Sequence, residues 1–283
     1  MGNHIYRIVD NGFLADSGKL SRFLRVAGTI GANDWTAKQR NSEREYLEGL
    51  TAIPKDVQIA YRMFDMYLAA AAYVRSPSRV LDVGCGINPH RPPYTATLCG
   101  RLAGREVVYV GLDPMEQNVE RRDYPFVCGR IEDTIGLFVD RFDMFVFATT
   151  LDHVEDIKVA AQAVRHLASE SAICVFWVGV HDPPRIAEAA GASWFRELFA
   201  SVGLLHLLRA LAVLSIRILR LGLKLMLREK FLSRGMPLDD LHFHYFTNKN
   251  LRGSLEVFGT LLDLTPVPGT NSVFAIVQVH REP

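Results

Sequence analysis

Two glycines and an aspartate in the middle of the chain have the spacing of a site for a ribose-containing ligand. The apolar run 79–83 leads directly into a turn that contains Gly84 and Gly86. Glycine lets the backbone turn sharply and approach a ligand without a side chain in the way. The next apolar run, 107–112, ends at Asp113. A carboxylate there can accept hydrogen bonds from two ribose hydroxyls, so the pattern predicts a nucleotide-like ligand.

The glycine turn differs from the turn that binds dinucleotides. Dinucleotide sites carry G-x-G-x-x-G, but the third glycine position is occupied here by Pro89. Asp82, just before the turn, would also repel a pyrophosphate. S-adenosylmethionine carries an ammonium and a sulfonium group and no phosphate, so it suits this turn better. A dinucleotide-dependent oxidoreductase is therefore the least favoured class.

Five segments of the chain, in order, resemble the motifs of class I S-adenosylmethionine-dependent methyltransferases of small molecules. The first two are LDVGCG and VGLD. FVCGRIEDT resembles the third-strand motif of the family, and FDMFVFATTLDHVED resembles its fourth-strand motif. LDDLHFHYFTNKNL resembles the histidine- and FT-containing segment before the last helix. The resemblance covers residues 77–180 and 238–281 and implies the fold, cofactor and enzymatic activity of this family.

The resemblance also implies which residues bind S-adenosylmethionine. They follow four successive strands: Asp82, Gly84 and Gly86 for the methionine end, Asp113 and Met115 for the ribose, Ile131 and Glu132 for the adenine, and Thr149 and Thr150 to close the site. Two positions depart from the family pattern. Asn88 replaces a glycine of the turn, and Arg130 replaces an aspartate near the adenine.

Histidines near the predicted site could supply a base. Methyl transfer is an in-line displacement that mainly requires alignment of the two reacting atoms. A hydroxyl acceptor also needs a group that takes its proton, and histidine has a suitable pKa. His153, directly after the fourth strand, is the first candidate for the catalytic base, followed by His244 and His242. His181 follows the fifth strand and is a further candidate, and Asp152 could orient a histidine.

Neither a metal ion nor a nucleic acid is expected as a partner. His242 and His244 alternate, so they would share a face if the chain were extended there. No acidic residues at suitable spacing accompany them, which argues against a metal site. The segment after the fourth strand reads ATTL rather than the N-P-P-Y or D-P-P-Y of amino-methylating nucleic-acid enzymes, and the formal net charge is +1.

The order of apolar runs predicts the fold that must position these residues. From residue 77 onward, strand candidates alternate with helix candidates, which is typical of a parallel sheet covered by helices. The strands are expected at 79–83, 107–112, 126–128, 143–148, 172–180, 260–266 and 272–280, with the clearest helices at 156–168 and 248–258. The short turn VPGTN implies that the last two strands are antiparallel. We expect an α/β, Rossmann-like class I methyltransferase fold with a seven-stranded, mostly parallel sheet and an antiparallel last strand.

Two further segments complete the predicted domain organisation. Residues 1–76 would form a helical N-terminal cap, with helices at 35–50 and 54–74. Residues 181–237 would form an apolar, basic helical insertion between the two parts of the methyltransferase domain, 77–180 and 238–283.

The centre of the insertion, 195–231, is a strongly apolar stretch with regularly spaced cations. On a helix the cations fall within an arc of about 100°: Arg209, Arg217, Arg220, Lys224 and Arg228. Three interpretations are open: a helix in a membrane interface, a lid or homodimer interface, and a core helix. A transmembrane span is not expected, because Arg209 and Arg217 would lie near its middle.

Composition places the protein among ordinary globular chains. It has 283 residues, of which 49% are hydrophobic and 22% are charged, and it carries no secretory or myristoylation signal. The four cysteines lack C-x-x-C spacing and suit a reducing compartment. We therefore expect a cytoplasmic protein, peripheral at a membrane surface if the basic helix lies on one.

Together these patterns predict an S-adenosylmethionine-dependent methyltransferase for a small-molecule acceptor. The acceptor atom would be an oxygen of a sugar, a natural-product intermediate or a lipid-linked metabolite. The alternative is a non-catalytic scaffold or sensor that binds S-adenosylmethionine and docks on a membrane or partner through 195–231.

Overall fold

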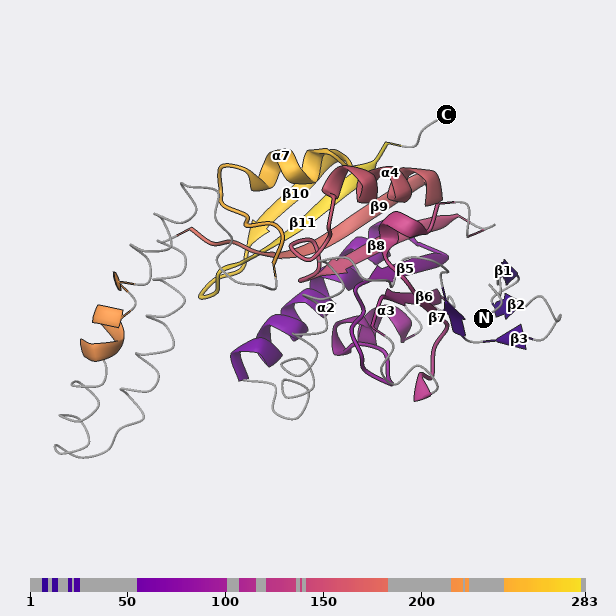
Figure 1. Ribbon diagram of the computed structural model, residues 1–283, viewed down its shortest axis with the longest axis horizontal. Coiled ribbons are helices and arrows are strands. Elements are labelled where there is room, and N and C mark those ends of the chain that lie inside the picture. Colours follow the sequence, from indigo (N-terminus) through magenta and orange to yellow (C-terminus); the bar gives the residue numbers. More distant parts are fainter. Residues whose placement is uncertain are drawn as a thin grey trace.

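An eight-stranded sheet forms the centre of the structure, which is a computed structural model (Figure 1). The residues that the structure describes are 7–9, 12–14, 20–21, 23–25, 55–100, 107–115, 121–135, 138, 141–182, 215–220, 222–223 and 242–280. In spatial order the strands are β10 (Gly259–Pro266), β11 (Ser272–Val279), β9 (Ala168–Gly179), β8 (Phe142–Ala148), β5 (Arg79–Val83), β6 (Val108–Asp113), β7 (Phe126–Cys128) and β4 (Phe23–Arg25).

The strand directions confirm the predicted class I methyltransferase architecture. Neighbouring strands from β4 to β9 pair in parallel, and β11 is antiparallel to both β9 and β10. All seven strands expected from the sequence are present, with bounds that shift by at most four residues. In parallel strands all carboxyl ends meet at one edge, so the glycine turn after β5 and Asp113 at the end of β6 become neighbours.

The N-terminal segment differs from the all-helical cap expected for residues 1–76. Helix α2 (Lys55–Arg75) is present as predicted, but residues 7–25 contain the short strands β1 (Arg7–Val9), β2 (Gly12–Leu14) and β3 (Leu20–Ser21), followed by β4. Strand β4 pairs with β7 and adds an eighth strand to the sheet. An edge strand offers unpaired backbone groups to any extended segment, and this long-range pairing has no local sequence signal. The expected helix at 35–50 lies outside the described residues.

Buried side chains form two layers, one on each face of the sheet. Alternate residues of a strand point to opposite faces, and in β5 Leu81 joins one layer while Val80 joins the other. Helices α4 (Ile157–Leu167) and α7 (Leu251–Glu256) cover the first layer. Helix α2 covers the second, with Phe64 and Leu68 fully buried (Figure 1).

Short helices and turns complete the edge of the sheet where the strands end. They are the 3-10 helix η1 (Pro93–Thr95), helix α3 (Ala96–Cys99) and the 3-10 helix η4 (Ile131–Asp133). Helix α4 begins at a defined cap: the Asp156 carboxylate accepts hydrogen bonds from the backbone N–H groups of Lys158 and Val159, at 2.8 and 3.3 Å. The turn between β8 and α4 is thereby fixed where α4 begins.

Only a small part of the predicted insertion, 181–237, is described. Residues 215–220 and 222–223 are helical and exposed. The exposed apolar side chains there include Ile216, Leu219 and Leu223. Within the part of the chain that the structure describes, no helix combines the length and the apolar character that crossing a membrane would require.

Candidate active site

A cavity of about 320 Å³ opens at the carboxyl ends of β5, β6, β7 and β8. Ten of the twelve residues predicted to bind cofactor or act in catalysis line it: Gly84, Gly86, Asp113, Met115, Ile131, Glu132, Thr149, Thr150, His153 and His242. The other two, Asp82 and His244, do not. The sequence therefore predicted most of the cavity wall, because the turns that follow parallel strands converge at one edge.

The turn after β5 requires glycine for two different reasons. Gly84 and Gly86 have φ angles of +74° and +77°, which side-chain-bearing residues rarely adopt. A Cβ atom at Gly84 would lie 2.2 Å from Cγ2 of Thr150, whereas a Cβ at Gly86 would have no neighbour within 4 Å. Gly84 thus permits close packing of two loops, and Gly86 leaves open space beside the cavity.

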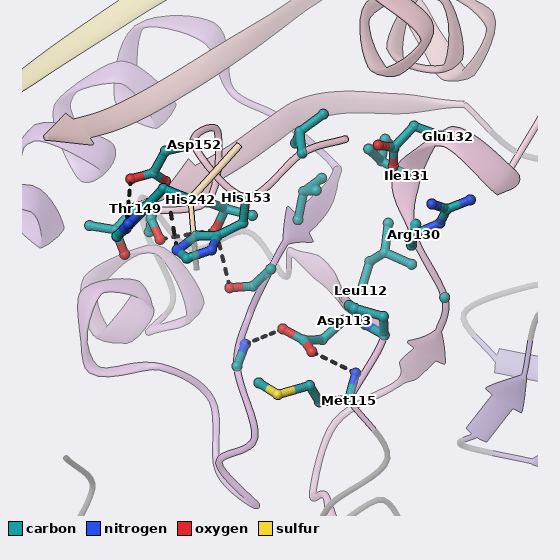
Figure 2. Close-up of a pocket in the computed structure, with 18 residues that line it drawn as sticks. Leu112, Asp113, Met115, Arg130, Ile131, Glu132, Thr149, Asp152, His153 and His242 are labelled. Carbon is teal, nitrogen blue, oxygen red and sulfur yellow. Dashed lines mark hydrogen bonds and ion pairs between the residues drawn. The ribbon is translucent and has the colours of Figure 1, made fainter. Parts of the chain in front are cut away.

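The carboxylate of Asp113 joins β6 to the glycine turn. Its Oδ2 accepts a hydrogen bond from the Gly86 N–H at 2.9 Å, and its Oδ1 accepts one from the Met115 N–H at 2.8 Å. Burial raises the pKa of the Asp113 carboxyl group, and the Met115 N–H, the charge of Arg122 and the Gly86 N–H oppose this rise. Asp113 is therefore held in one orientation at the cavity wall (Figure 2).

Asp82 lies beneath the glycine turn and outside the cavity wall, in contrast to its predicted contact with the methionine end. The Tyr94 hydroxyl donates to its two carboxylate oxygens at 3.0 and 3.2 Å, and the Tyr109 hydroxyl donates at 2.5 Å. The side chain is fully buried, which raises its pKa to about 7. Asp82 shares a face of β5 with Val80, because residues two apart on a strand point the same way.

Arg122 supports the same turn and was missed by the sequence analysis. Its Nη2 donates to the Gly86 carbonyl oxygen at 2.8 Å, its Nη1 donates to the Tyr124 hydroxyl, and its guanidinium carbon lies 3.6 Å from the ring centroid of Phe126. The side chain is only 6% exposed. An arginine in the loop before β7 belongs to none of the recognised motifs, so only the tertiary contact identifies it.

Ile131 and Glu132 lie on η4, at the far end of the cavity from the histidines (Figure 2). Oε1 of Glu132 accepts a hydrogen bond from the Glu155 N–H at 3.1 Å, and burial raises the pKa of Glu132. Arg130, the departure noted in the sequence, pairs with Asp133 at 2.8 Å and with Glu155. The positive charge of Arg130 is thus compensated locally.

At the other end of the cavity, Asp152, His153 and His242 form a cluster (Figure 2). Nε2 of His242 lies 3.4 Å from Oδ2 of Asp152, and Nε2 of His153 lies 3.8 Å from Oδ1 of the same carboxylate. The two imidazole centroids are 4.7 Å apart. Thr149, with a φ of +56°, turns the chain directly before this cluster.

His244 lies outside this cluster, although it was predicted to share a face with His242. Residues 242–245 form no strand, and the imidazole of His244 instead lies beside Phe246, with ring centroids 6.3 Å apart. The argument against a metal site also needs correction. Its premise was that no acidic residues at suitable sequence spacing accompany His242 and His244, but the fold brings Asp152 to His242 across 90 positions of sequence.

Comparisons with known proteins show the fold. No protein-family model matches the chain, and no curated protein matches it in sequence. Among solved structures, human N-acetylserotonin methyltransferase with S-adenosylmethionine matches with a TM-score of 0.51 and 13% identity, over 88% of this chain and 59% of that chain. The 1,6-didemethyltoxoflavin-N1-methyltransferase of Burkholderia thailandensis, with its substrate and S-adenosylhomocysteine, matches with a TM-score of 0.50 and 15% identity, over 89% and 92%.

A third similar structure is the plantazolicin methyltransferase BpumL, in complex with a pentazolic desmethyl analogue and S-adenosylhomocysteine. It matches with a TM-score of 0.50 and 11% identity, over 88% of this chain and 94% of that chain. At these identities the likeness establishes the architecture. The chain has the class I methyltransferase fold, as its motifs predicted.

Proposed function

We propose that this protein is an S-adenosylmethionine-dependent methyltransferase that methylates an oxygen atom of a small molecule. The observation that carries the proposal is the position of Asp113, which is tied to Gly86 and Met115 at the wall of a cavity at the carboxyl ends of the strands. The class I fold supports the same conclusion.

The chemistry of the cavity wall fits S-adenosylmethionine better than a phosphate-bearing cofactor. The acidic side chains in the wall are Asp113, Glu132 and Asp152, while Arg130 is already paired with two carboxylates. Such a wall attracts a cationic ligand and repels a pyrophosphate. The space beside Gly86 would let the cofactor lie close to the backbone, since a Cβ there would meet no protein atom within 4 Å. When bound, the cofactor supplies an electrophilic methyl group.

Different residues along the cavity wall would contact different parts of the cofactor. Asp113 holds its carboxylate where it can accept hydrogen bonds from ribose hydroxyls, because each of its oxygens retains a lone pair beyond the backbone contact. The apolar side chain of Ile131 and the stem of Glu132 offer a surface for the adenine ring. Thr149 and Thr150 also line the cavity and would close the site after β8.

The histidine cluster is the proposed site of the acceptor. A hydroxyl attacks the methyl group once its proton is withdrawn; the oxygen–carbon bond then forms as the carbon–sulfur bond breaks. His153 is our first candidate to take that proton, with Asp152 beside it to stabilise the protonated imidazole. His242 is the second candidate, because it meets the same carboxylate.

The test of cofactor binding is calorimetric titration with S-adenosylhomocysteine. We expect micromolar binding that falls at least tenfold in Asp113→Ala and is unchanged in Glu256→Ala, whose exposed carboxylate pairs only with Arg252 on the surface of α7 among the contacts described. A parallel titration with NAD tests the competing dinucleotide interpretation. Tighter binding of NAD than of S-adenosylhomocysteine would refute the proposal.

The test of catalysis is methyl transfer from labelled S-adenosylmethionine to a panel of hydroxylated small molecules and their amine counterparts. With an accepted substrate, His153→Ala should lower turnover by about 10²-fold or more. His244→Ala is the matched control, because it makes the same change at a histidine that does not line the cavity. Unchanged turnover of His153→Ala at saturating substrate would exclude its catalytic role.

A second property is favoured by the exposed part of the insertion. Ile216, Leu219 and Leu223 are each more than half exposed and stand beside Arg217 and Arg220. Apolar side chains interspersed with cations suit the headgroup region of an anionic membrane. We propose that this segment docks the protein on such a surface, where lipid-linked acceptors would be found. The lid and homodimer interpretations stay predictions.

A further inference from the structure

We propose that Asp152, His153 and His242 form a binding site for a divalent transition-metal ion, with Zn²⁺ as the best match. One carboxylate and two imidazoles are a donor set that zinc uses in catalytic sites, where three protein ligands leave one position open. Each of the three residues offers one ligand atom, and these atoms lie within 4.8 Å of one another.

The distances agree with the edges of a coordination polyhedron. Zinc bonds of about 2.1 Å place the ligand atoms of a tetrahedral site about 3.4 Å apart. The observed separations are 3.4 Å from Asp152 Oδ2 to His242 Nε2 and 3.8 Å from Oδ1 of the same carboxylate to His153 Nε2. Both exceed the roughly 2.7–2.9 Å of a charge-assisted hydrogen bond. The three groups therefore converge at a spacing that one shared ion would bridge.

Backbone contacts hold the two segments that carry the ligands in place. Asp152 and His153 belong to the turn after β8, where the His153 N–H donates to the Thr150 carbonyl oxygen at 2.9 Å. The N–H groups of Phe243 and His244 donate to the Asp152 carbonyl oxygen at 2.9 and 3.2 Å. His242 is thereby docked on Asp152 by main-chain bonds that do not involve the ligand atoms. The site is formed before any ion arrives.

Burial and charge favour a cation at this position. Asp152 is 6% exposed, and the side chains of His153 and His242 are 14% and 22% exposed. A carboxylate and two imidazoles at such buried positions offer a cation three ligand groups that are largely shielded from water. All three residues also line the cavity, so the open coordination position would face the acceptor.

The consequence for catalysis rests on the proposed function, whereas the metal site itself does not. A zinc ion lowers the pKa of a bound water to about 7, and an acceptor hydroxyl bound there would be acidified in the same way. Its proton would leave to solvent before the oxygen attacks the methyl group. In the ion-loaded protein His153 is then a ligand, and it acts as a base only in the ion-free protein.

The experiment uses the full-length, tag-free protein after treatment with a chelator. Zn²⁺ is titrated by calorimetry, and Co²⁺ by the visible ligand-field absorption that a low-coordinate site produces. We expect one ion per chain at micromolar affinity or tighter. Asp152→Asn, His153→Ala and His242→Ala should each weaken binding at least tenfold, and the neighbouring His244→Ala should not.

Each variant is also titrated with S-adenosylhomocysteine, which reports whether the fold and the cofactor end of the cavity are intact. Retained S-adenosylhomocysteine binding with lost metal binding supports the inference. His242→Asn serves as a second variant if His242→Ala does not fold. Absence of Zn²⁺ and Co²⁺ binding in the intact protein, or binding that survives in His242→Ala, would overturn the metal site while leaving the proposed methyltransferase untouched. If the intact protein does not bind S-adenosylhomocysteine, this would count against the proposed function but not against the metal site.

Discussion

The side chain of Thr150 fills the space in which a side chain at Gly84 would lie. A Cβ atom at Gly84 would come within 2.2 Å of Thr150 Cγ2 and 2.3 Å of Thr150 Oγ1. Thr150 Oγ1 also donates to the Gly84 carbonyl oxygen at 3.4 Å. The turn after β5 and the turn after β8 are thus fitted to each other at the cavity wall.

Gly84→Ala should destabilise the protein more than Gly86→Ala. Both substitutions place a side chain at a left-handed backbone position, which costs about 1–2 kcal/mol. Only Gly84→Ala adds a clash with Thr150, because the space around Gly86 is open. Urea unfolding of the two variants measures the difference. Adding Thr150→Ala to Gly84→Ala should restore part of the lost unfolding free energy. Equal losses of unfolding free energy in Gly84→Ala and Gly86→Ala would refute the packing role of Thr150.

Asp82 should make the protein less stable as the pH rises. The carboxyl titrates near 3.8 in the unfolded chain and at about 7 in the folded protein, where burial is the main cause of the shift. Between these values the folded protein keeps a proton that the unfolded chain has released. The free energy of unfolding therefore falls from about pH 4 to pH 7, by up to about 4 kcal/mol for three pKa units.

The measurement is urea unfolding of the intact protein and Asp82→Asn at pH 5 and pH 8. The amide cannot ionise, so the variant should lose less stability than the intact protein over this interval. Asp113, whose pKa is also raised, is present in both proteins and cancels in the comparison. An identical pH dependence in the two proteins would contradict the assignment to Asp82.

Arg122→Lys should weaken cofactor binding although the residue does not line the cavity. Lysine keeps the charge but loses the planar fork that reaches Gly86 and Tyr124 together and lies over Phe126. We expect a loss of about 1–3 kcal/mol in unfolding free energy, and about tenfold weaker S-adenosylhomocysteine binding. Arg121→Lys, at the neighbouring exposed position, is the control. If calorimetry gives equal S-adenosylhomocysteine affinities for Arg122→Lys and Arg121→Lys, Arg122 does not support the turn in the way proposed.

Charge reversal in the exposed insertion helix should release the protein from anionic vesicles. Each cation near an anionic surface contributes about 1 kcal/mol, so Arg217→Glu with Arg220→Glu should lower vesicle binding at least tenfold. Cosedimentation with phosphatidylserine-containing vesicles and with neutral phosphatidylcholine vesicles measures the binding of the intact protein and of the variant. S-adenosylhomocysteine affinity should stay constant in the same variant. Failure of the intact protein to bind anionic vesicles would exclude the membrane-docking proposal.

The sequence by itself determined seven of the eight strands of the sheet and most of the cavity wall. Local signals sufficed there: apolar runs specify strands, and glycines mark the turn after β5. The carboxyl ends of parallel strands must share an edge, so Gly84, Gly86 and Asp113 could be placed together from the sequence alone. For the same reason His153, directly after β8, was predicted at the cavity and lies there.

Tertiary structure alone decided which long-range neighbours meet. Strand alternation says that Asp82 and Val80 share a face, but only the packing of Tyr94 and Tyr109 shows that this face is closed to the cavity. The approach of His242 to Asp152 depends on how the chain returns to β8 after the insertion. Such contacts depend on the free energy of packing the whole chain, which no local periodicity encodes, and so the three-residue cluster at the acceptor end could not be foreseen.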